Sequence, residues 1–275
     1  MLMMPNLKYQ PISETLSSGV QLVQKIDTKN SPLHYVQLKI LEMELNSSYE
    51  ESLAKQEVCI VALTGKITIT DFTQTFKKIG TRGSVFEKIP TDSVYISNNQ
   101  TFKVTAESKA KVLIAYSPST RQLPTKLIAA KDNTIEYRGK YQNKRLVHNI
   151  LPDDSPIANS LLVVEVYTDG GNWSSYPPHK HDQDNLPTES LLEETYYHEM
   201  DPPQGFVFQR VYTDDRSIDE TMTVECGEVV VVPKGYHPVS VPDGYNSYYL
   251  NVMAGPTRKW QFHNDPFHEW ILDRK

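Results

Sequence analysis

Short hydrophobic stretches separated by turn residues recur along the whole chain. They are rich in Val, Ile, Leu, Tyr and Phe and lie at 33–45, 57–70, 102–117, 159–168, 205–213, 227–235 and 247–255. Runs of this kind, bounded by Gly, Pro, Asn or Asp, predict β-strands. Long amphipathic helical patterns are nearly absent, and the best helix candidate is the short stretch 264–275, whose Asn-Asp-Pro start is typical of a helix N-terminus. The pattern therefore predicts an all-β protein built from sandwiches or barrels.

The two halves of the chain contain similar hydrophobic patterns. In the first half, TGKITI (64–69) is followed by IPTDSVYI (89–96), and the second half contains CGEVVVVPKGYHPV (226–239). Both have a glycine turn, a strand and a proline-containing turn. A more polar segment, 125–158, separates the halves, so we place a domain boundary near residue 140. The predicted domains are 1–140 and 141–275, two β-barrel units in tandem.

Composition narrows the class of protein. The 275 residues carry a net charge of -6, have no basic block, and contain no apolar run long enough for a transmembrane helix. Nucleic-acid and membrane partners are therefore not expected. The N-terminus lacks a secretory signal pattern. Cys59 and Cys226 lie in hydrophobic, strand-like surroundings, which favours buried free thiols and a reducing, cytoplasmic location.

The histidines point to a candidate metal site in the second half. Only His34, expected to be on the surface or packed, precedes residue 148. His179 and His181 occur in SSYPPHKHD, and on a strand their side chains would face the same way while Lys180 points outward. Two imidazoles suit zinc, iron, nickel, copper or manganese. The alternative interpretation is two solvated histidines beside a proline turn.

Two later residues could complete this site. Glu194 shares a strand face with His198 by alternation, and His237 follows a Pro-x-Gly turn. Glu189 and Glu193 are competing carboxylates, but Glu193 has the opposite strand parity and Glu189 lies in a loop. Together with the two earlier histidines, this predicts three nitrogen ligands and one oxygen ligand. Such a set leaves open positions on the metal for a substrate.

The order His-x-His, later Glu, then His after Pro-x-Gly resembles the cupin barrel. The gap between the second His and the Glu, 182–193, is longer than usual and is predicted to be an inserted loop. Longer motifs resemble the 5-deoxy-glucuronate isomerase family, which is bicupin and acts in inositol catabolism. These motifs cover nearly the whole chain and lie at 55–69, 80–96, 136–154, 161–182, 202–221 and 229–260.

The resemblance implies an enzyme and a mechanism. The family interconverts the aldose 5-deoxy-D-glucuronate and the ketose 5-dehydro-2-deoxy-D-gluconate, by metal-assisted proton transfer through an enediol. It implies one divalent metal ion (Zn, Mn, Fe or Ni), no organic cofactor and a small sugar acid as the partner. A homo-oligomer is a possible further partner, but the sequence does not specify the oligomeric state. The metal ligands would be His179, His181, Glu194 and His237. The first half is expected to be a metal-free cupin used for packing and assembly.

The substrate carboxylate suggests an arginine partner, since guanidinium groups bind carboxylates through paired hydrogen bonds. Arg210 lies within a predicted strand, where a charge is unusual unless it is functional or ion-paired. Arg145, outside the predicted barrel, is the weaker candidate. Tyr249 and Asn251 share a strand face and would either bind sugar hydroxyls or form a satisfied pair lining the barrel.

The proton-transferring base is not identified by the sequence. Asp215 and Glu220 are candidates, although they also fit a solvated acidic loop, and Lys180 is disfavoured because it should point outward. Two other functions fit the same ligands. One is a metal-dependent cupin dioxygenase and the other is a sugar-binding bicupin without catalysis.

Overall fold

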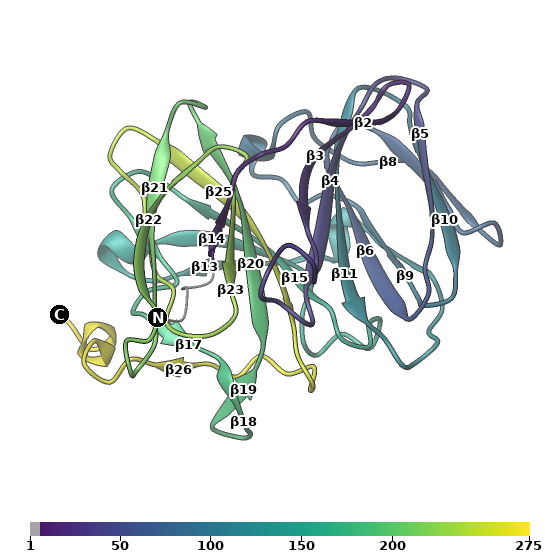
Figure 1. Ribbon diagram of the computed structural model, residues 1–275. Coiled ribbons are helices and arrows are strands. Elements are labelled where there is room, and N and C mark those ends of the chain that lie inside the picture. Colours follow the sequence, from purple (N-terminus) through teal and green to yellow (C-terminus); the bar gives the residue numbers. More distant parts are fainter. Residues whose placement is uncertain (1–5) are drawn as a thin grey trace.

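The computed structural model describes residues 6–275 and is built almost entirely of β-strands arranged as two sandwiches (Figure 1). The first sandwich has one large and one small sheet. The large sheet contains, in spatial order, β12 (Lys126–Ile128), β9 (Ser93–Ile96), β6 (Gln56–Thr64), β11 (Ala110–Pro118), β4 (Gln37–Met43), β3 (Val20–Ile26) and β2 (Glu14–Ser17). The small sheet contains β5 (Ser48–Ser52), β10 (Thr101–Ala106), β7 (Ile67–Thr70) and β8 (Thr75–Ile79).

The second sandwich repeats this arrangement. Its large sheet contains β1 (Lys8–Tyr9), β23 (Val229–Val232), β20 (Glu193–Asp201), β25 (Asn246–Ala254), β15 (Leu162–Thr168), β14 (Arg145–Leu151) and β13 (Thr134–Arg138). Its small sheet contains β16 (Trp173–Ser174), β24 (Val239–Ser240), β21 (Phe206–Tyr212) and β22 (Asp219–Glu225). The predicted all-β tandem architecture is confirmed. The boundary near residue 140 stays a prediction, and in the structure it falls between β13 and β14 of this sheet.

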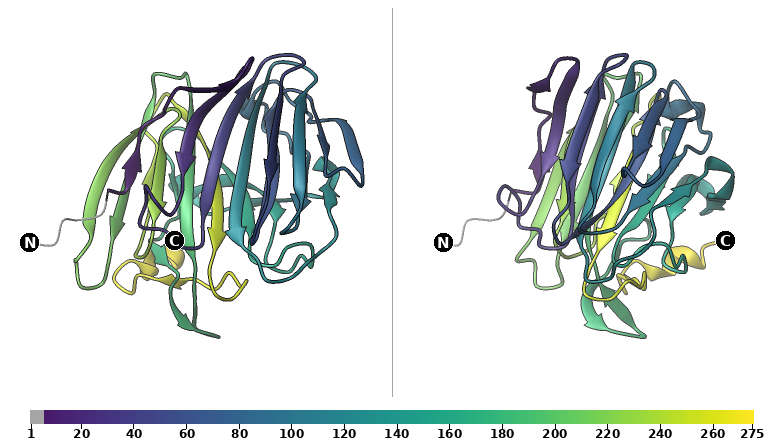
Figure 2. Two further views of the ribbon diagram at one scale, coloured as in Figure 1. Left: turned by 45° about the vertical axis from the view of Figure 1, so that its right-hand side comes forward. Right: turned by 90° about the vertical axis from the view of Figure 1, so that its right-hand side faces the viewer.

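The N-terminal strand β1 joins the second sandwich rather than the first, with Lys8 opposite Val230 and Tyr9 opposite Val229. Short pairs of strands lie at one end of this sandwich, where the C-terminal segment also runs (Figures 1 and 2). They are β17 (His179–Lys180) with β26 (His263–Asn264), and β18 (Asp182–Asn185) with β19 (Glu189–Leu191). The single-turn 3-10 helices are η1 (Val85–Glu87), η2 (Ala130–Asp132), η3 (Tyr141–Asn143) and η4 (Glu269–Leu272).

The two large sheets pack against each other, and strand alternation explains why. In β6, Val58 and Ile60 pack inside the first sandwich, whereas Cys59 and Val61 belong to a core shared with the second sandwich. Each large sheet is therefore buried on both faces, which is why its central strands read as nearly continuous hydrophobic runs. The shared core makes one folded body of the two sandwiches.

Buried carboxylates also cross between the sandwiches. Glu57 accepts hydrogen bonds from the backbone N–H groups of Ser160 and Leu161, at 2.7 and 2.8 Å. The second sandwich also contributes a carboxylate: Glu165 accepts from Arg82 of the first sandwich, and both side chains are fully buried. Such charges are tolerated inside a protein only when they are paired and hydrogen-bonded. The two halves are consequently held in one relative orientation.

Three smaller expectations have mixed outcomes. The helix expected over 264–275 is present only as the 3-10 turn η4. Both cysteines are free thiols, with Cys59 buried and Cys226 half-buried. In residues 6–275, no helix is long and apolar enough to cross a membrane.

Candidate metal centre and adjoining cavity

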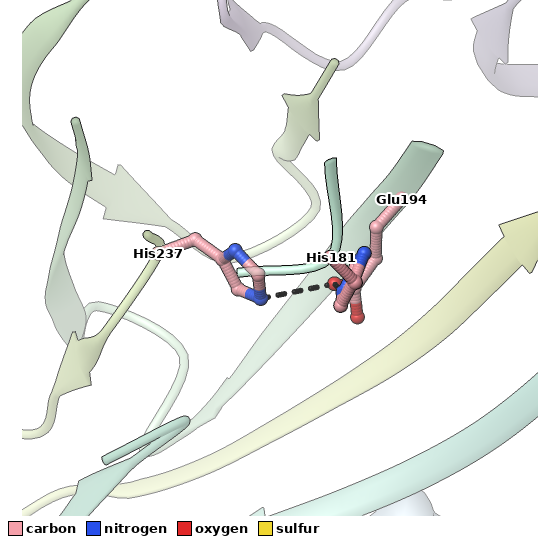
Figure 3. Close-up of side chains that lie close together, drawn as sticks. All are labelled: His181, Glu194 and His237. Carbon is pink, nitrogen blue, oxygen red and sulfur yellow. Dashed lines mark hydrogen bonds and ion pairs between the residues drawn. The ribbon is translucent and has the colours of Figure 1, made fainter. Parts of the chain in front are cut away.

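Three buried side chains from separate segments meet inside the second sandwich. His181 lies between β17 and β18, Glu194 is the second residue of β20, and His237 lies in the turn between β23 and β24. One nitrogen or carboxylate oxygen from each lies within 4.8 Å of the others. Figure 3 shows His237 turned toward Glu194, with His181 next to Glu194. In the described part of the chain this is the one cluster of three potential metal-ligating residues at such distances.

The neighbouring glutamates have other partners. Glu193 points to the opposite face of β20 and accepts hydrogen bonds from the backbone N–H groups of His34 and Tyr35 in the first sandwich. Glu189 forms an ion pair with Lys180, at 3.1 Å. The structure therefore places Glu194, the carboxylate favoured by strand alternation, with the histidines and directs its two rivals elsewhere.

Backbone carbonyls fix the tautomers of the two buried histidines. Nδ1 of His181 lies 2.9 Å from the carbonyl oxygen of Leu192, and Nδ1 of His237 lies 2.8 Å from that of Gly235. A carbonyl can only accept, so each Nδ1 carries the hydrogen and each Nε2 keeps its lone pair in the neutral ring. Both Nε2 atoms point at one carboxylate oxygen of Glu194, at 3.1 and 3.2 Å.

When both rings are neutral, the two Nε2 atoms and the carboxylate oxygen are three lone-pair donors that converge with no hydrogen between them. Burial opposes ionisation of Glu194, but His237 and His181 outweigh burial and lower the pKa of this carboxyl to about 2. Burial lowers the pKa of His181, but the Glu194 carboxylate outweighs it and the net change is a rise. The cluster therefore attracts positive charge. Two imidazole nitrogens and a carboxylate are a donor set suited to a divalent transition metal ion.

The turn that carries His237 depends on Gly235. This glycine has φ +96°, and a Cβ there would lie 2.5 Å from the carbonyl oxygen of Tyr212. Its N–H donates to the side chain of Asp182, which follows His181 directly. This hydrogen bond therefore links the segment that carries His181 to the turn that carries His237.

His179, the remaining predicted ligand, lies beside the cluster but outside the group of three. Its half-buried ring has its centroid 5.0 Å from that of His237 and 6.4 Å from that of His181. On its other side it packs against Phe262, at 4.7 Å. Burial, with the neighbouring histidines, lowers its pKa well below the usual range. The ring is therefore neutral at neutral pH and can offer a lone pair.

Lys180 is not solvated, contrary to the outward orientation expected. It does lie on the other side of β17 from the histidines, but it is only 3% exposed and forms ion pairs with Asp182 and Glu189. The reason is that the stretch 182–193, predicted to be a loop, contains the β18–β19 hairpin, whose Glu189 folds over Lys180. Lys180 and its carboxylate partners therefore lie on the side of β17 that faces away from the histidines.

The predicted substrate-binding residues are separated in space. Arg210 is partly exposed and pairs with Asp219, at 2.8 Å. Tyr249 is buried against Tyr196, with ring centroids 4.8 Å apart, and burial raises its pKa. Asn251, also buried, donates to the backbone of β20. Tyr249 and Asn251 thus line the inside of the sandwich, whereas Arg210 does not lie with them.

The two acidic base candidates lie outside the cluster of His181, Glu194 and His237. Asp215 is in an exposed loop, where it accepts hydrogen bonds from Thr213 and Ser217, and these bonds lower its pKa. Glu220 lies in β22, opposite Val211 of β21. The structure places neither with the buried histidines.

Tyr196, to which the sequence assigned no role, lies next to the cluster. Its ring is 5.7 Å from that of His237, and its hydroxyl lies 3.0 Å from Oγ of Ser175. Burial and then the charge of Glu194 raise its pKa well above the usual value, so the hydroxyl keeps its proton. Strand alternation was the available signal, since Tyr196 has the same parity as Glu194.

A cavity of about 450 Å³ opens beside His179. Trp260 and Phe262 form apolar parts of its wall. The positively charged side chains that line it are Arg138, Lys140, Arg145 and Arg274. No Asp or Glu is among its lining residues in the described chain. We call this space the basic cavity.

Known proteins resemble this chain over nearly its whole length. The model of the KduI/IolB family matches residues 10–271. The chain is 72% identical to the 5-deoxy-glucuronate isomerase of Bacillus licheniformis over 98% of this chain and 100% of the relative. The corresponding values for the enzyme of that name from Bacillus subtilis strain 168 are 70%, 98% and 100%.

Solved structures agree on the fold. An IolB-like protein from Salmonella typhimurium LT2 is 46% identical, has a TM-score of 0.93, and matches over 97% of this chain and 99% of its own. Oxalate decarboxylase from Bacillus subtilis is 12% identical, with a TM-score of 0.67 over 96% of this chain and 80% of its own. The latter likeness concerns the fold alone, and it confirms the predicted bicupin architecture.

Proposed function

The chain belongs to the KduI/IolB family, and from this membership and its buried cluster we propose how it acts. It is an intramolecular aldose–ketose isomerase that converts 5-deoxy-D-glucuronate into 5-dehydro-2-deoxy-D-gluconate in inositol catabolism. The observation that carries the proposal is the convergence of three lone-pair donors beside the basic cavity. The reaction moves a hydrogen from C2 to C1 of the substrate, so it needs no redox cofactor.

We propose that His181, Glu194 and His237 hold one divalent metal ion, with His179 as the fourth ligand. Among residues 6–275, the buried Nε2 of His237 has no hydrogen-bond partner, and it keeps its lone pair in the neutral ring, which supports this assignment. Zinc, manganese, iron and nickel all accept three nitrogens and one oxygen. When bound, the ion would supply positive charge that stabilises negative charge developing on the oxygens at C1 and C2.

The protein side chains would supply hydrogen bonding and exclude water. The protonated hydroxyl of Tyr196 is a donor for an oxygen that becomes negative during the reaction. Tyr249 and Asn251 close the inner side of the sandwich, which keeps the reacting groups in surroundings of low polarity. We also propose that Tyr249 and Asn251 bind sugar hydroxyls. Arg210 pairs with Asp219 and does not lie with these two residues, so its predicted role in substrate binding needs a separate test.

Elemental analysis combined with a turnover assay tests this function. The purified protein should contain about one divalent transition metal ion per chain and should isomerise 5-deoxy-D-glucuronate without oxygen. Turnover under anaerobic conditions also separates it from a dioxygenase, which would consume oxygen. Absence of both metal and turnover would contradict the proposal, and metal with sugar binding but no turnover would favour a non-catalytic bicupin. The cytoplasmic location and the homo-oligomer stay predictions.

A further inference from the structure

The guanidinium group of Arg145 has no carboxylate partner in the described part of the chain. It is half-buried, and Nη1 donates to the carbonyl oxygens of Asn143 and Tyr176, at 2.9 and 3.5 Å. By contrast, Arg138 pairs with Glu136 at 2.7 Å, and Arg210 pairs with Asp219. Burial of an unpaired guanidinium is unfavourable, so its presence in a cavity needs a compensating interaction.

The local backbone presents Arg145 to the basic cavity. Gly139 has φ +87°, and a Cβ there would collide with the carbonyl oxygen of Asn143, the group that also accepts from Arg145. The 3-10 turn η3 connects the two positions, and β14 begins at Arg145. The arginine therefore extends from the first residue of a buried strand, a more rigid support than a loop.

The other charged side chains that line the basic cavity are also positive. Arg138, Lys140 and Arg274 line the same cavity, and Arg274 donates to the backbone oxygen of Lys140 at 3.2 Å. A hollow lined by one sign of charge with apolar walls concentrates the field and attracts the opposite charge. Burial lowers the pKa of Arg145, and Arg138 acts in the same direction, which again indicates surroundings without enough negative charge.

We propose that Arg145 binds the carboxylate of the substrate, and that this contact orients the sugar acid with its aldehyde end toward His179. The proposal rests on the isomerase function proposed above and adds the residue that selects an acid. One cavity contains both Arg145 and His179, so a single extended ligand can contact both. A guanidinium matches a carboxylate with two parallel hydrogen bonds, which sets direction as well as affinity.

Kinetics on two substrates test the selection of the acid. The substrates are 5-deoxy-D-glucuronate and its neutral analogue 5-deoxy-D-glucose, in which –CH2OH replaces the carboxylate. Arg145→Gln should lower kcat/KM for the acid by roughly 10²-fold, the scale for breaking a buried charged contact, and should change that for the neutral aldose little. Arg145→Lys, which keeps the charge but not the fork, should fall between. Equal losses for both substrates, or no loss, would overturn the assignment.

Direct binding separates this inference from the isomerase function. Glutarate, a simple dicarboxylate, should bind the metal-loaded wild type and should bind Arg145→Gln at least tenfold more weakly in calorimetry. Arg216→Gln is the matched control, because Arg216 is an exposed arginine that pairs with Asp219. Elemental analysis should give the same metal content in all three. Equal glutarate affinity, or none for the wild type, would refute the carboxylate site even if turnover is normal, whereas binding without turnover would contradict only the isomerase function.

Discussion

The side chain of Asp182 accepts a hydrogen bond from the backbone N–H of Gly235 at 2.9 Å. Asp182 directly follows His181, and Gly235 supplies the carbonyl that fixes the Nδ1 hydrogen of His237. The same carboxylate also accepts from Lys180, at 2.7 Å. The half-buried carboxylate of Asp182 therefore holds in place the two segments that carry the candidate metal ligands His181 and His237.

Replacing Asp182 should weaken metal binding without removing a ligand. We expect Asp182→Ala to lower the affinity for the bound divalent ion by about 10–100-fold, the usual effect of losing a group that orients a ligand. The reason is that the N–H of Gly235 loses its acceptor and the buried Lys180 loses one of its two hydrogen-bonded carboxylate partners, keeping Glu189. Competition with a chromogenic chelator would measure the affinity.

Asp184→Ala is the matched control for this change. Asp184 is an exposed acidic residue of the same hairpin, two positions further along. It should keep the wild-type affinity, and both variants should have the same far-UV circular dichroism. If the two variants lose metal equally, the effect comes from the hairpin's net charge and the positioning role of Asp182 is refuted.

Substitutions of the adjacent residues Glu193 and Glu194 should have different effects, one on stability and the other on metal binding. Glu194→Gln should lose the bound metal ion and turnover, because a carboxylate ligand becomes a neutral amide. Glu193→Ala should keep the metal but lower the free energy of unfolding by about 1–3 kcal/mol, since two backbone N–H groups of the first sandwich lose their acceptor. Elemental analysis and urea unfolding separate the two effects. Metal loss from Glu193→Ala with retention in Glu194→Gln would reverse the assignment.

Strand alternation explains how much of the cluster was predictable. The parity of β20 places Glu194 inside and Glu193 outside, and a Pro-x-Gly turn places His237 after β23. These inferences rest on neighbours in sequence, and period two is a strong local constraint. The all-β tandem fold was predictable for the same reason.

Features that depend on distant contacts were not predictable. Lys180 is buried because Glu189, nine residues away, folds over it, and the sequence of the hairpin does not specify that contact. The pairing of β1 with β23 joins positions separated by more than two hundred residues. Each of these follows from chain topology rather than from a local pattern.

Removing the hydroxyl of Tyr196 should slow the reaction while leaving substrate affinity nearly unchanged. We expect Tyr196→Phe to lower kcat by roughly 10–10³-fold, as for loss of one donor to a developing negative oxygen, with KM close to wild type. The metal content should not change, because the hydroxyl is not among the three clustered ligands. A rise in KM with normal kcat would instead indicate ground-state binding.

The pair formed by Arg82 and Glu165 should stabilise the association of the sandwiches. Both side chains are fully buried, and one oxygen–nitrogen distance is 3.2 Å. Arg82→Met should lower the free energy of unfolding by about 3–5 kcal/mol, because it leaves a buried carboxylate unpaired. Urea unfolding of folded, metal-free protein would measure it.

An exposed ion pair offers the comparison for this buried one. Lys88 and Asp169 also join the two halves, at 2.6 Å, but their side chains are 37% and 64% exposed. Lys88→Met should cost only about 0–1 kcal/mol, because water screens the pair. Similar losses from both substitutions would mean that burial of the Arg82–Glu165 pair does not determine its contribution.

Acid should destabilise the protein partly through Glu165. Burial opposes its ionisation, but Arg82 and the hydrogen bonds from neighbouring side chains outweigh burial and lower its pKa from 4.5 to about 2. A folded-state pKa below the unfolded value adds stability that is present above pH 4.5 and is lost as the pH falls toward 2. We therefore expect the loss of unfolding free energy between pH 5 and pH 3 to be about 2 kcal/mol smaller in Glu165→Gln than in the wild type. Urea titrations of both proteins with a chelator present would measure this difference without a contribution from metal release, and parallel pH profiles would show that Glu165 titrates equally in the folded and unfolded chains.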